Sequence, residues 1–439
     1  MQQLVQLPGT WSDPADLIQA FGDEPWALCL SSGPRWTYIA RAPSACVTLT
    51  AARGEEAVQQ LKGLRGPLDP KLGPGPAPFS GGVVGLASYD FGERLQRLDR
   101  GGASAWPDLV AARFDALLAF DRQDQKVMAI GRGEVTAQAQ ERAEFARSWL
   151  DGRSSPAAAR EGALFLPDDP IAYERAVADV VDRIGAGEIF QANIARTWQG
   201  ALSGRPVDLF RRLAHASPAP FAAYLRLTGL ALVSNSPERF IEVRDRQALT
   251  EPIKGTRPRG RDDEEDEALA RQLEASAKDR AENLMIVDLM RNDLARSCRP
   301  GSVSVPALFD LRSYANVHHL VSIVRGELQE DFDAVDLLLS AFPPGSVTGA
   351  PKIQAMRVIA GHETPRGPYC GSLFWLGYDG AMDSNVLIRS IACTETAGGW
   401  LAEARAGAGI VADSDPHAER LETEAKISAI AKAFSGAAQ

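Results

Sequence analysis

The sequence predicts an α+β fold in which largely antiparallel β-sheets pack together and helices lie on the outside. Two observations predict it. Short apolar segments bounded by Gly and Pro are typical of strands, and they occur in hairpin-like groups. Helical patterns fall between these groups, not after every strand as in a regular βαβ winding. A chain of 439 residues with 45% hydrophobic and 24% charged residues can also bury a substantial core.

Each element is predicted from its own pattern. Amphipathic periodicity predicts a helix over 171–186, and two further helices are expected at about 275–295 and about 416–434. Strands are predicted in the N-terminal third at WALCL, WTYIA, ACVTLTA, GGVVGLASYD and ALLAFD. Further strands are predicted at FAAYLRL, LALVSN, RFIEVRD, HLVSIVRGEL, GSLFWLGY and SNVLIRSIAC.

The chain divides by composition into three parts. Residues 1–150 are expected to form a smaller N-terminal module of short strands. Residues 151–170 are rich in small, polar and Pro residues, which is typical of a connector. Residues 171–439 carry the segments that could perform chemistry, and we expect them to form the catalytic domain.

Charge and cysteine content exclude several classes of partner. A formal net charge of -10 repels phosphate backbones and anionic membrane surfaces, so neither nucleic acid nor a membrane is an expected partner. The five cysteines are scattered and form no CxxC or Cys/His cluster, which indicates neither a disulfide framework nor a zinc site. The start lacks a signal-peptide pattern, and no apolar run reaches the roughly 20 residues that span a bilayer. A cytoplasmic protein is expected.

The segment EPIKGTRPRG at 251–260 places Lys254 between a Pro-Ile and a Gly-Thr pair. Because Pro fixes φ and Gly frees it, the segment can present backbone N–H groups, a hydroxyl and an amine toward a ligand. It could equally be a surface turn with a solvated lysine. A buried lysine beside other cations or a metal has a lowered pKa and can act as a nucleophile or base.

Three glutamates on two predicted helices could bind a metal. Glu282 lies at the edge of a buried apolar run, while Glu419, Glu422 and Lys426 share a helix face with Ile427 and other apolar residues. Magnesium is typically held by one or two carboxylates plus waters and substrate oxygens. The alternative is an acidic first helical turn with a Glu422–Lys426 pair, which stabilises a helix by only a few tenths of a kcal/mol.

Glycine-rich and cationic segments recur further along the chain: PPGSVTGAPK, YCGSLFWLGY, LIRSIAC and AGAGIVADSD. None matches a nucleotide-binding fingerprint. Together they offer backbone N–H groups, hydroxyls and Arg389, which suit a carboxylated substrate. His319 opens an apolar strand, where a histidine is more often a packed core residue than a catalyst.

In chain order these segments resemble the chorismate-binding family, which includes anthranilate synthases, aminodeoxychorismate synthases, isochorismate synthases and salicylate synthases. The resemblance covers about residues 170 to 435 and is weaker before residue 150. It rests on EIFQANIAR, SNSPERFIEV, EPIKGTRPRG, DRAENLMIVDLMRNDLARSC, YANVHHLVSIVRGEL, FPPGSVTGAPK, RGPYCGSLFWLGY, NVLIRSI and AGAGIVADSDPHAERLETEAK.

The resemblance implies a role for each matching residue. It implies a Mg²⁺ cofactor held by Glu282 and Glu422 with Glu419 close by, and it places His319 in the active site. For the substrate chorismate it implies a larger set of binding residues: Gly255, Thr256, Tyr369, Arg389, Gly407, Ala408, Gly409 and Lys426.

Lys254 distinguishes between branches of the family. PIKGT resembles component I of the aminodeoxychorismate synthases, whereas anthranilate synthases usually carry PIAGT. In that branch Lys254 would attack C2 of chorismate while Glu238 protonates the departing C4 hydroxyl, and ammonia would then enter at C4. The chain lacks a plausible glutaminase domain, so ammonia would come from a separate glutamine amidotransferase subunit. Anthranilate synthase and isochorismate synthase activities remain alternatives, as does a scaffold that only docks a glutaminase.

Overall fold

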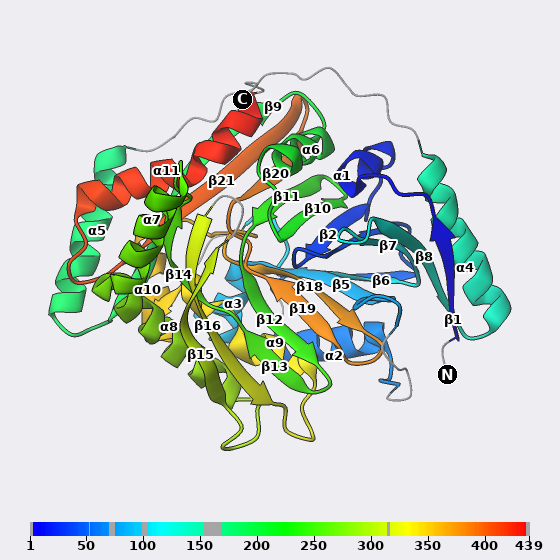
Figure 1. Ribbon diagram of the computed structural model, residues 1–439, viewed down its shortest axis with the longest axis horizontal. Coiled ribbons are helices and arrows are strands. Elements are labelled where there is room, and N and C mark those ends of the chain that lie inside the picture. Colours follow the sequence, from blue (N-terminus) through cyan, green and yellow to red (C-terminus); the bar gives the residue numbers. More distant parts are fainter. Residues whose placement is uncertain are drawn as a thin grey trace.

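Two antiparallel β-sheets lie face to face in the computed structural model, and helices cover their outer faces (Figure 1). The structure describes residues 3–51, 53–69, 75–98, 104–152, 169–313 and 317–435. The α+β fold with largely antiparallel sheets is therefore confirmed, since every pair of neighbouring strands is antiparallel within these residues.

The first sheet has eleven strands. In spatial order they are β1 (Gln3–Gly9), β8 (Lys126–Gly133), β7 (Ala116–Asp121), β3 (Trp36–Ala40), β2 (Leu28–Ser32), β10 (Phe221–Leu227), β11 (Leu230–Ser236), β20 (Ser390–Thr396), β21 (Gly399–Ile410), β9 (Gln191–Leu202) and β17 (Gly349–Ala350).

The second sheet has ten strands. In spatial order nine of them are β14 (Ile253–Pro258), β16 (Val317–Glu327), β13 (Gln247–Thr250), β12 (Arg239–Arg244), β19 (Met382–Asn385), β18 (Ser372–Gly377), β5 (Gly82–Ala87), β6 (Leu109–Phe114) and β4 (Ala45–Leu49), and β15 (Ser304–Ser313) also pairs with β16.

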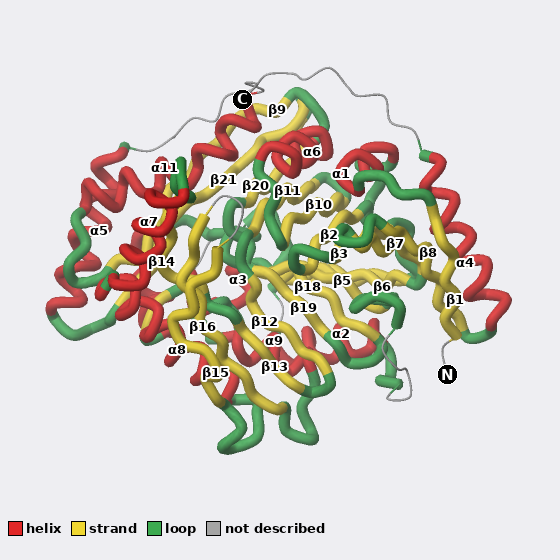
Figure 2. Tube along the Cα trace, in the orientation of Figure 1, coloured by secondary structure: helices red, strands yellow, loops and turns green. Residues whose placement is uncertain are grey.

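Helices pack on the outside of both sheets (Figure 2). Against the first sheet lie α1 (Pro14–Leu17), α4 (Thr136–Ser148), α5 (Pro170–Gly185), α6 (Pro206–Ala216), α10 (Lys352–His362) and α11 (Pro416–Ser435). Against the second lie α2 (Gly54–Arg65), α7 (Asp263–Ala275) and α8 (Ala277–Ala295), with α9 (Ala334–Ala341) between α2 and α8; α3 (Tyr89–Leu95) follows β5. No helix among the described residues is long and apolar enough to cross a bilayer.

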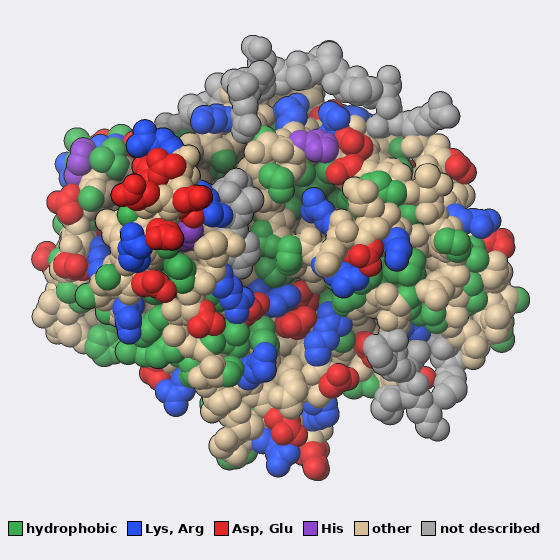
Figure 3. All heavy atoms as spheres, viewed as in Figure 1, with side chains coloured by type: hydrophobic (Ala, Val, Ile, Leu, Met, Phe, Trp, Pro, Cys, Tyr) green, Lys and Arg blue, Asp and Glu red, His purple; other side chains and the backbone are tan. Residues whose placement is uncertain are grey.

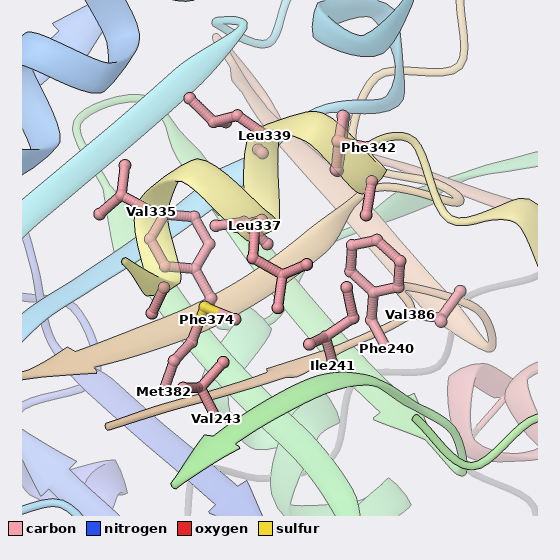
Figure 4. Packing of buried hydrophobic residues seen from close by; sticks show 14 of the residues in the cluster. Phe240, Ile241, Val243, Val335, Leu337, Leu339, Phe342, Phe374, Met382 and Val386 are labelled. Carbon is pink, nitrogen blue, oxygen red and sulfur yellow. The ribbon is translucent and has the colours of Figure 1, made fainter. Parts of the chain in front are cut away.

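The core is divided by the sheets into layers. Between the sheets, Tyr38, Phe79 and Trp375 are buried, and the ring of Phe79 contacts the rings of the other two. Outside the second sheet, side chains of β12, β18 and β19 meet those of α9, and Phe240 contacts Phe342 (Figure 4). Each strand of such a sandwich alternates its side chains between two buried faces, which explains the nearly continuous apolar runs in the sequence.

The N-terminal strands belong to the same two sheets as the later ones. Strand β2 pairs with β10 in the first sheet, and β5 pairs with β18 in the second. A division of the chain at 1–150 and 171–439 therefore does not follow the sheets. Most of the expected connector at 151–170 lies outside the described residues, since the structure describes 151–152 and 169–170 only.

One predicted strand is wrong. The segment SNVLIRSIAC was expected to form a single strand, but β19 ends at Asn385 in the second sheet and β20 begins at Ser390 in the first. Arg389 has a φ of 51°, a conformation that interrupts a strand. The apolar pattern continues through the break because the connecting residues Val386 and Leu387 are buried as well.

Candidate active site

A cavity of about 720 Å³ lies between β14, β21, α8 and α11 and is lined by nearly all the residues predicted for the site. The structure brings together Glu238, Lys254, Gly255, Thr256, Glu282, His319, Tyr369, Arg389, Gly407, Gly409, Glu419, Glu422 and Lys426. Ala408 is the one predicted residue that does not line it. On the face of the molecule in Figure 3, acidic and basic side chains are interspersed.

Two chain crossings between the sheets supply Glu238 and Arg389. Glu238 lies between β11 of the first sheet and β12 of the second, and Arg389 lies between β19 of the second and β20 of the first. The crossings are hydrogen-bonded to each other, since Val386 N donates to Glu238 O at 3.0 Å and Asn235 N donates to Arg389 O at 3.0 Å. Glu238 and Arg389 thus reach the same cavity from the two segments in which the chain passes between the sheets.

Gly255 shapes the edge strand that carries Lys254. The register of β14 against β16 shifts between Ile253 and Thr256, so the strand bulges there. Gly255 has a φ of +84°, and a Cβ at this position would lie 2.8 Å from Leu273 and 3.0 Å from Asp279. Only glycine fits this conformation beside the neighbouring helices. The segment is an edge strand and not the surface turn that was the simpler alternative.

Ser346 joins Lys254 to Glu238. The Lys254 amine donates to the Ser346 carbonyl at 3.2 Å, and the Ser346 hydroxyl donates to Glu238 Oε1 at 2.7 Å. Burial lowers the pKa of Lys254, and the charge of Lys426 lowers it further, while Glu238 opposes the shift. Burial raises the pKa of Glu238, although Lys254 and the Ser346 hydrogen bond oppose this. Burial thus moves the two pKa values toward each other, while the attraction between the two charges opposes both shifts.

His319 faces the same cavity from β16. Its Nδ1 lies 2.9 Å from Thr256 Oγ1 on the neighbouring strand β14. Burial lowers the pKa of His319, and the positive charge of Arg389 lowers it further. The imidazole is therefore a neutral hydrogen-bonding group at neutral pH. It lines the cavity and is not enclosed in the apolar core.

The strand β21 forms part of the cavity wall. Gly407 and Gly409 line it, and Lys426 Nζ donates to Gly407 O at 2.9 Å. The side chain of Ala408 packs on the opposite face with Val177 and other apolar residues, so only its backbone could contribute to the predicted binding of substrate. Successive side chains of a strand point to opposite faces, which places the Ala408 methyl away from the cavity.

Glu282, Glu419 and Glu422 reach the cavity from two helices, as predicted. Glu282 lies on α8, and the other two lie on α11. Their oxygens do not all lie within 4.8 Å of one another, and Glu422 pairs with Lys426 at 2.6 Å. Burial raises the pKa of Glu282 and of Glu419, and Glu422 raises both further. The repulsion that Glu422 exerts on the other two carboxylates fits a divalent cation that also takes substrate oxygens as ligands.

Sequence reasoning missed Ser346, Asn193 and Arg405, which all line the cavity. Ser346 lies in the PPGSVTGAPK segment, which did signal a ligand-binding loop. Asn193 lies in β9, within the segment EIFQANIAR that resembles the family, but nothing in that segment marks it individually; Arg405 lies in β21, just before the segment AGAGIVADSD. Their place beside the cavity follows from the pairing of β9 with β21, which local sequence does not reveal.

Comparison with known proteins gives a consistent family. The sequence profile of the chorismate binding enzymes matches residues 15–432, so it also covers most of the N-terminal part. The chain is 38% identical to an aminodeoxychorismate synthase component 1 of Salmonella typhimurium, over 92% of this chain and 92% of that protein. It is 36% identical to an anthranilate synthase component 1 of Geobacillus stearothermophilus, over 96% of this chain and 89% of that one.

Solved structures agree. The structure of anthranilate synthase component I from Streptococcus pneumoniae superposes with a TM-score of 0.78 at 26% identity, covering 92% of this chain and 93% of that one. The menaquinone-specific isochorismate synthase MenF of Escherichia coli shares the fold, with a TM-score of 0.73 at 19% identity over 99% of this chain and 95% of that one. The chain therefore belongs to the chorismate-binding enzyme family.

Proposed function

We propose that this enzyme is the chorismate-aminating component of an aminodeoxychorismate synthase, which makes 4-amino-4-deoxychorismate for 4-aminobenzoate and folate biosynthesis. The observation that carries the proposal is the Lys254 amine in the cavity, joined through Ser346 to the buried Glu238 carboxyl. A neutral amine is a nucleophile and a protonated carboxyl is a general acid, which are the two groups the first step needs.

The chemistry balances with these two residues. The Lys254 amine attacks C2, the ring double bonds shift, and the C4 hydroxyl leaves as water with the proton of Glu238. Ammonia then attacks C4, the double bonds shift back, and the C2–N bond to Lys254 breaks. Protons released by the two attacking nitrogens restore the carboxyl of Glu238 and the amine of Lys254. The new amine ends para to the ring carboxylate.

Other residues of the cavity would bind and orient the substrate. Arg389 would pair with one carboxylate through its planar guanidinium, while Thr256, Tyr369 and the backbone at Gly407 would supply further donors. His319 lies against Thr256 and would orient it. These groups fix chorismate with C2 toward Lys254.

A magnesium ion would be held by Glu282 and Glu422, with Glu419 beside them. When bound, it would neutralise a substrate carboxylate and polarise the leaving hydroxyl. Glu419 also accepts a hydrogen bond from Ser414 Oγ at 2.7 Å, which fixes its direction at the start of α11.

Ammonia would come from a separate glutamine amidotransferase subunit. The name "component 1" of the relatives implies a second component in those proteins, and this chain aligns with 92% of the Salmonella typhimurium protein. The five cysteines are all free, with only Cys46 exposed, which agrees with a reducing cytoplasm as its place of work.

Product identification tests the proposal. The purified enzyme is incubated with chorismate, magnesium and ammonium, and the products are separated by liquid chromatography and mass spectrometry. The expected product is 4-amino-4-deoxychorismate, and no ammonium should be needed for an adduct of chorismate on the peptide that contains Lys254. Anthranilate as the main product would assign the enzyme to the other branch, and isochorismate without amination would assign it to a third.

A further inference from the structure

The backbone of Asn193 on strand β9 is fixed from two sides. Its N–H donates to Thr348 O at 2.9 Å, and its carbonyl accepts from Arg366 Nη2 at 2.7 Å. The residue is only 7% exposed, and it lines the cavity. A side chain on so firmly held a backbone is pre-organised and has little freedom to lose when a ligand binds.

The carboxamide of Asn193 has a donor that the protein does not use. Its Nδ2 is buried and has no hydrogen-bond partner in the described part of the chain. A Cβ at Gly407 would lie 2.8 Å from this Nδ2 and 3.0 Å from Tyr369 Oη. An amide and a phenol therefore flank the same glycine of the cavity wall. Buried donors are nearly always hydrogen-bonded, so we expect a bound ligand to supply an acceptor for Asn193 Nδ2.

We propose that Asn193 is a substrate-binding residue whose amide N–H donates to a carboxylate oxygen of the substrate, beside Gly407 and Tyr369. The identity of the ligand as chorismate rests on the proposed function. A small rotation about the terminal torsion of an asparagine, which is soft, turns the N–H toward the cavity. An anionic acceptor suits the position. The amide offers a donor but carries no charge, so the nearby glutamates do not attract it.

Arg366 is the positioning residue for this donor pair. Its guanidinium is buried, binds Glu363 through Nε at 2.9 Å and Nη2 at 2.7 Å, and lies 5.6 Å from the ring centre of Tyr369. The same group holds the Asn193 carbonyl. One cation thus fixes the relative position of the amide and the phenol, although it does not line the cavity itself.

The test measures binding and not turnover. Chorismate is titrated by calorimetry into the full chain with magnesium and without ammonia, with every protein, including the wild-type reference, carrying Lys254→Ala so that no covalent adduct forms. Asn193→Ala removes the donor and should weaken chorismate binding about ten- to hundredfold, the range for a hydrogen bond to a charged group. Asn193→Asp keeps the shape but places a carboxylate beside the ligand, so it should weaken binding more than Ala does. This order distinguishes a direct contact from a merely structural role.

The matched control is Gln199→Ala, which removes a carboxamide from the same strand outside the cavity, where Gln199 Nε2 donates to Glu403. It should bind chorismate as the wild type does. Aspartate has the shape of asparagine, so Asn193→Asp still tests the proposal if the alanine variant fails to fold. Dissociation constants within twofold of wild type for a folded Asn193→Asp would overturn the proposal. A product other than 4-amino-4-deoxychorismate would remove the proposed function but leave this result standing.

Discussion

At the residue scale, burial moves the pKa values of Lys254 and Glu238 toward each other. The direction of each shift has a consequence for catalysis. A lowered pKa keeps the Lys254 amine neutral at lower pH than a free lysine, and a raised pKa keeps the Glu238 carboxyl protonated at higher pH than a free glutamate. Both shifts therefore act in the direction that the proposed first step requires.

Replacing the amine tests its role most directly. Lys254→Ala should slow formation of 4-amino-4-deoxychorismate by several orders of magnitude, because the covalent step is lost while the rest of the site still orients chorismate. Residual activity should shift toward amination at C2. Lys126→Ala, which removes a lysine exposed on β8, is the control. Para product at the wild-type rate from Lys254→Ala, with no adduct on the wild type, would contradict a covalent mechanism.

The pH profile of kcat/KM should be bell-shaped. Activity should fall at low pH as Lys254 is protonated and fall at high pH as Glu238 loses its proton. In Lys426→Met the acidic limb should move to higher pH, because the charge that lowers the pKa of Lys254 is removed. Glu238→Gln should lose about 10²–10⁴-fold in rate together with the alkaline limb. An unmoved acidic limb in Lys426→Met would mean that another group controls it.

The residues of this site differ in how far the sequence alone could predict them. Lys254, Glu238 and the glutamates lie in segments that resemble the family, and the structure places all of them at one cavity. Ser346 could not be predicted as their link, because its partners Lys254 and Glu238 are 92 and 108 positions away. Such contacts depend on how two distant strands and a loop meet, which no local pattern records.

At the element scale, the helices were easier to predict than the strand crossings. The helix predicted at about 416–434 is α11, and its start follows from Asp415, whose side chain accepts from Ala418 N at 2.8 Å ahead of Pro416. The crossing at Arg389 was missed because the apolar pattern continues from β19 through the crossing into β20. Both sheets are buried there, so the pattern does not mark the point where the chain changes sheets.

The two helices that carry the glutamates make a testable pair. Glu282→Gln on α8 and Glu422→Gln on α11 should each raise the magnesium concentration needed for half-maximal activity by about tenfold or more, because each removes a charged ligand. Unfolding midpoints should stay near wild type. Glu424→Gln is the control, since Glu424 lies on the same helix but pairs with Arg196 at 3.0 Å outside the cavity. Unchanged magnesium dependence in both variants would remove the metal from these helices.

A buried ion pair holds α10 to α8. Lys352 Nζ lies 2.6 Å from Asp293 Oδ2 and donates to Ala341 O at 2.6 Å. Lys352→Met should lower the free energy of unfolding by about 3–5 kcal/mol, because it leaves a buried carboxylate without its partner. The double variant Lys352→Met/Asp293→Leu should recover much of this loss, as urea denaturation would show. Equal stability of the single and double variants would show that the two charges do not depend on each other.

At the scale of the whole molecule, both sheets are completed only by pairing early strands with late ones. A fragment of residues 169–439 should therefore fail to fold alone, since it exposes the edges of β10 and β18 that β2 and β5 cover. Size-exclusion chromatography and circular dichroism should show aggregated or unfolded material, and mixing with residues 1–152 during refolding should restore chorismate binding. A monomeric fragment 169–439 with cooperative unfolding would establish it as an independent domain.

The same interleaving bears on how the protein forms in the cell. During synthesis, β1, β8, β7, β3 and β2 emerge first and can pair with one another, but the outer edge of β2 must wait for β10, and β9 must wait for β21. Pairings between such distant segments are slow to form, and exposed strand edges attract other chains while they wait. The nascent chain should therefore depend on chaperones until β21 and α11, the last elements described, leave the ribosome.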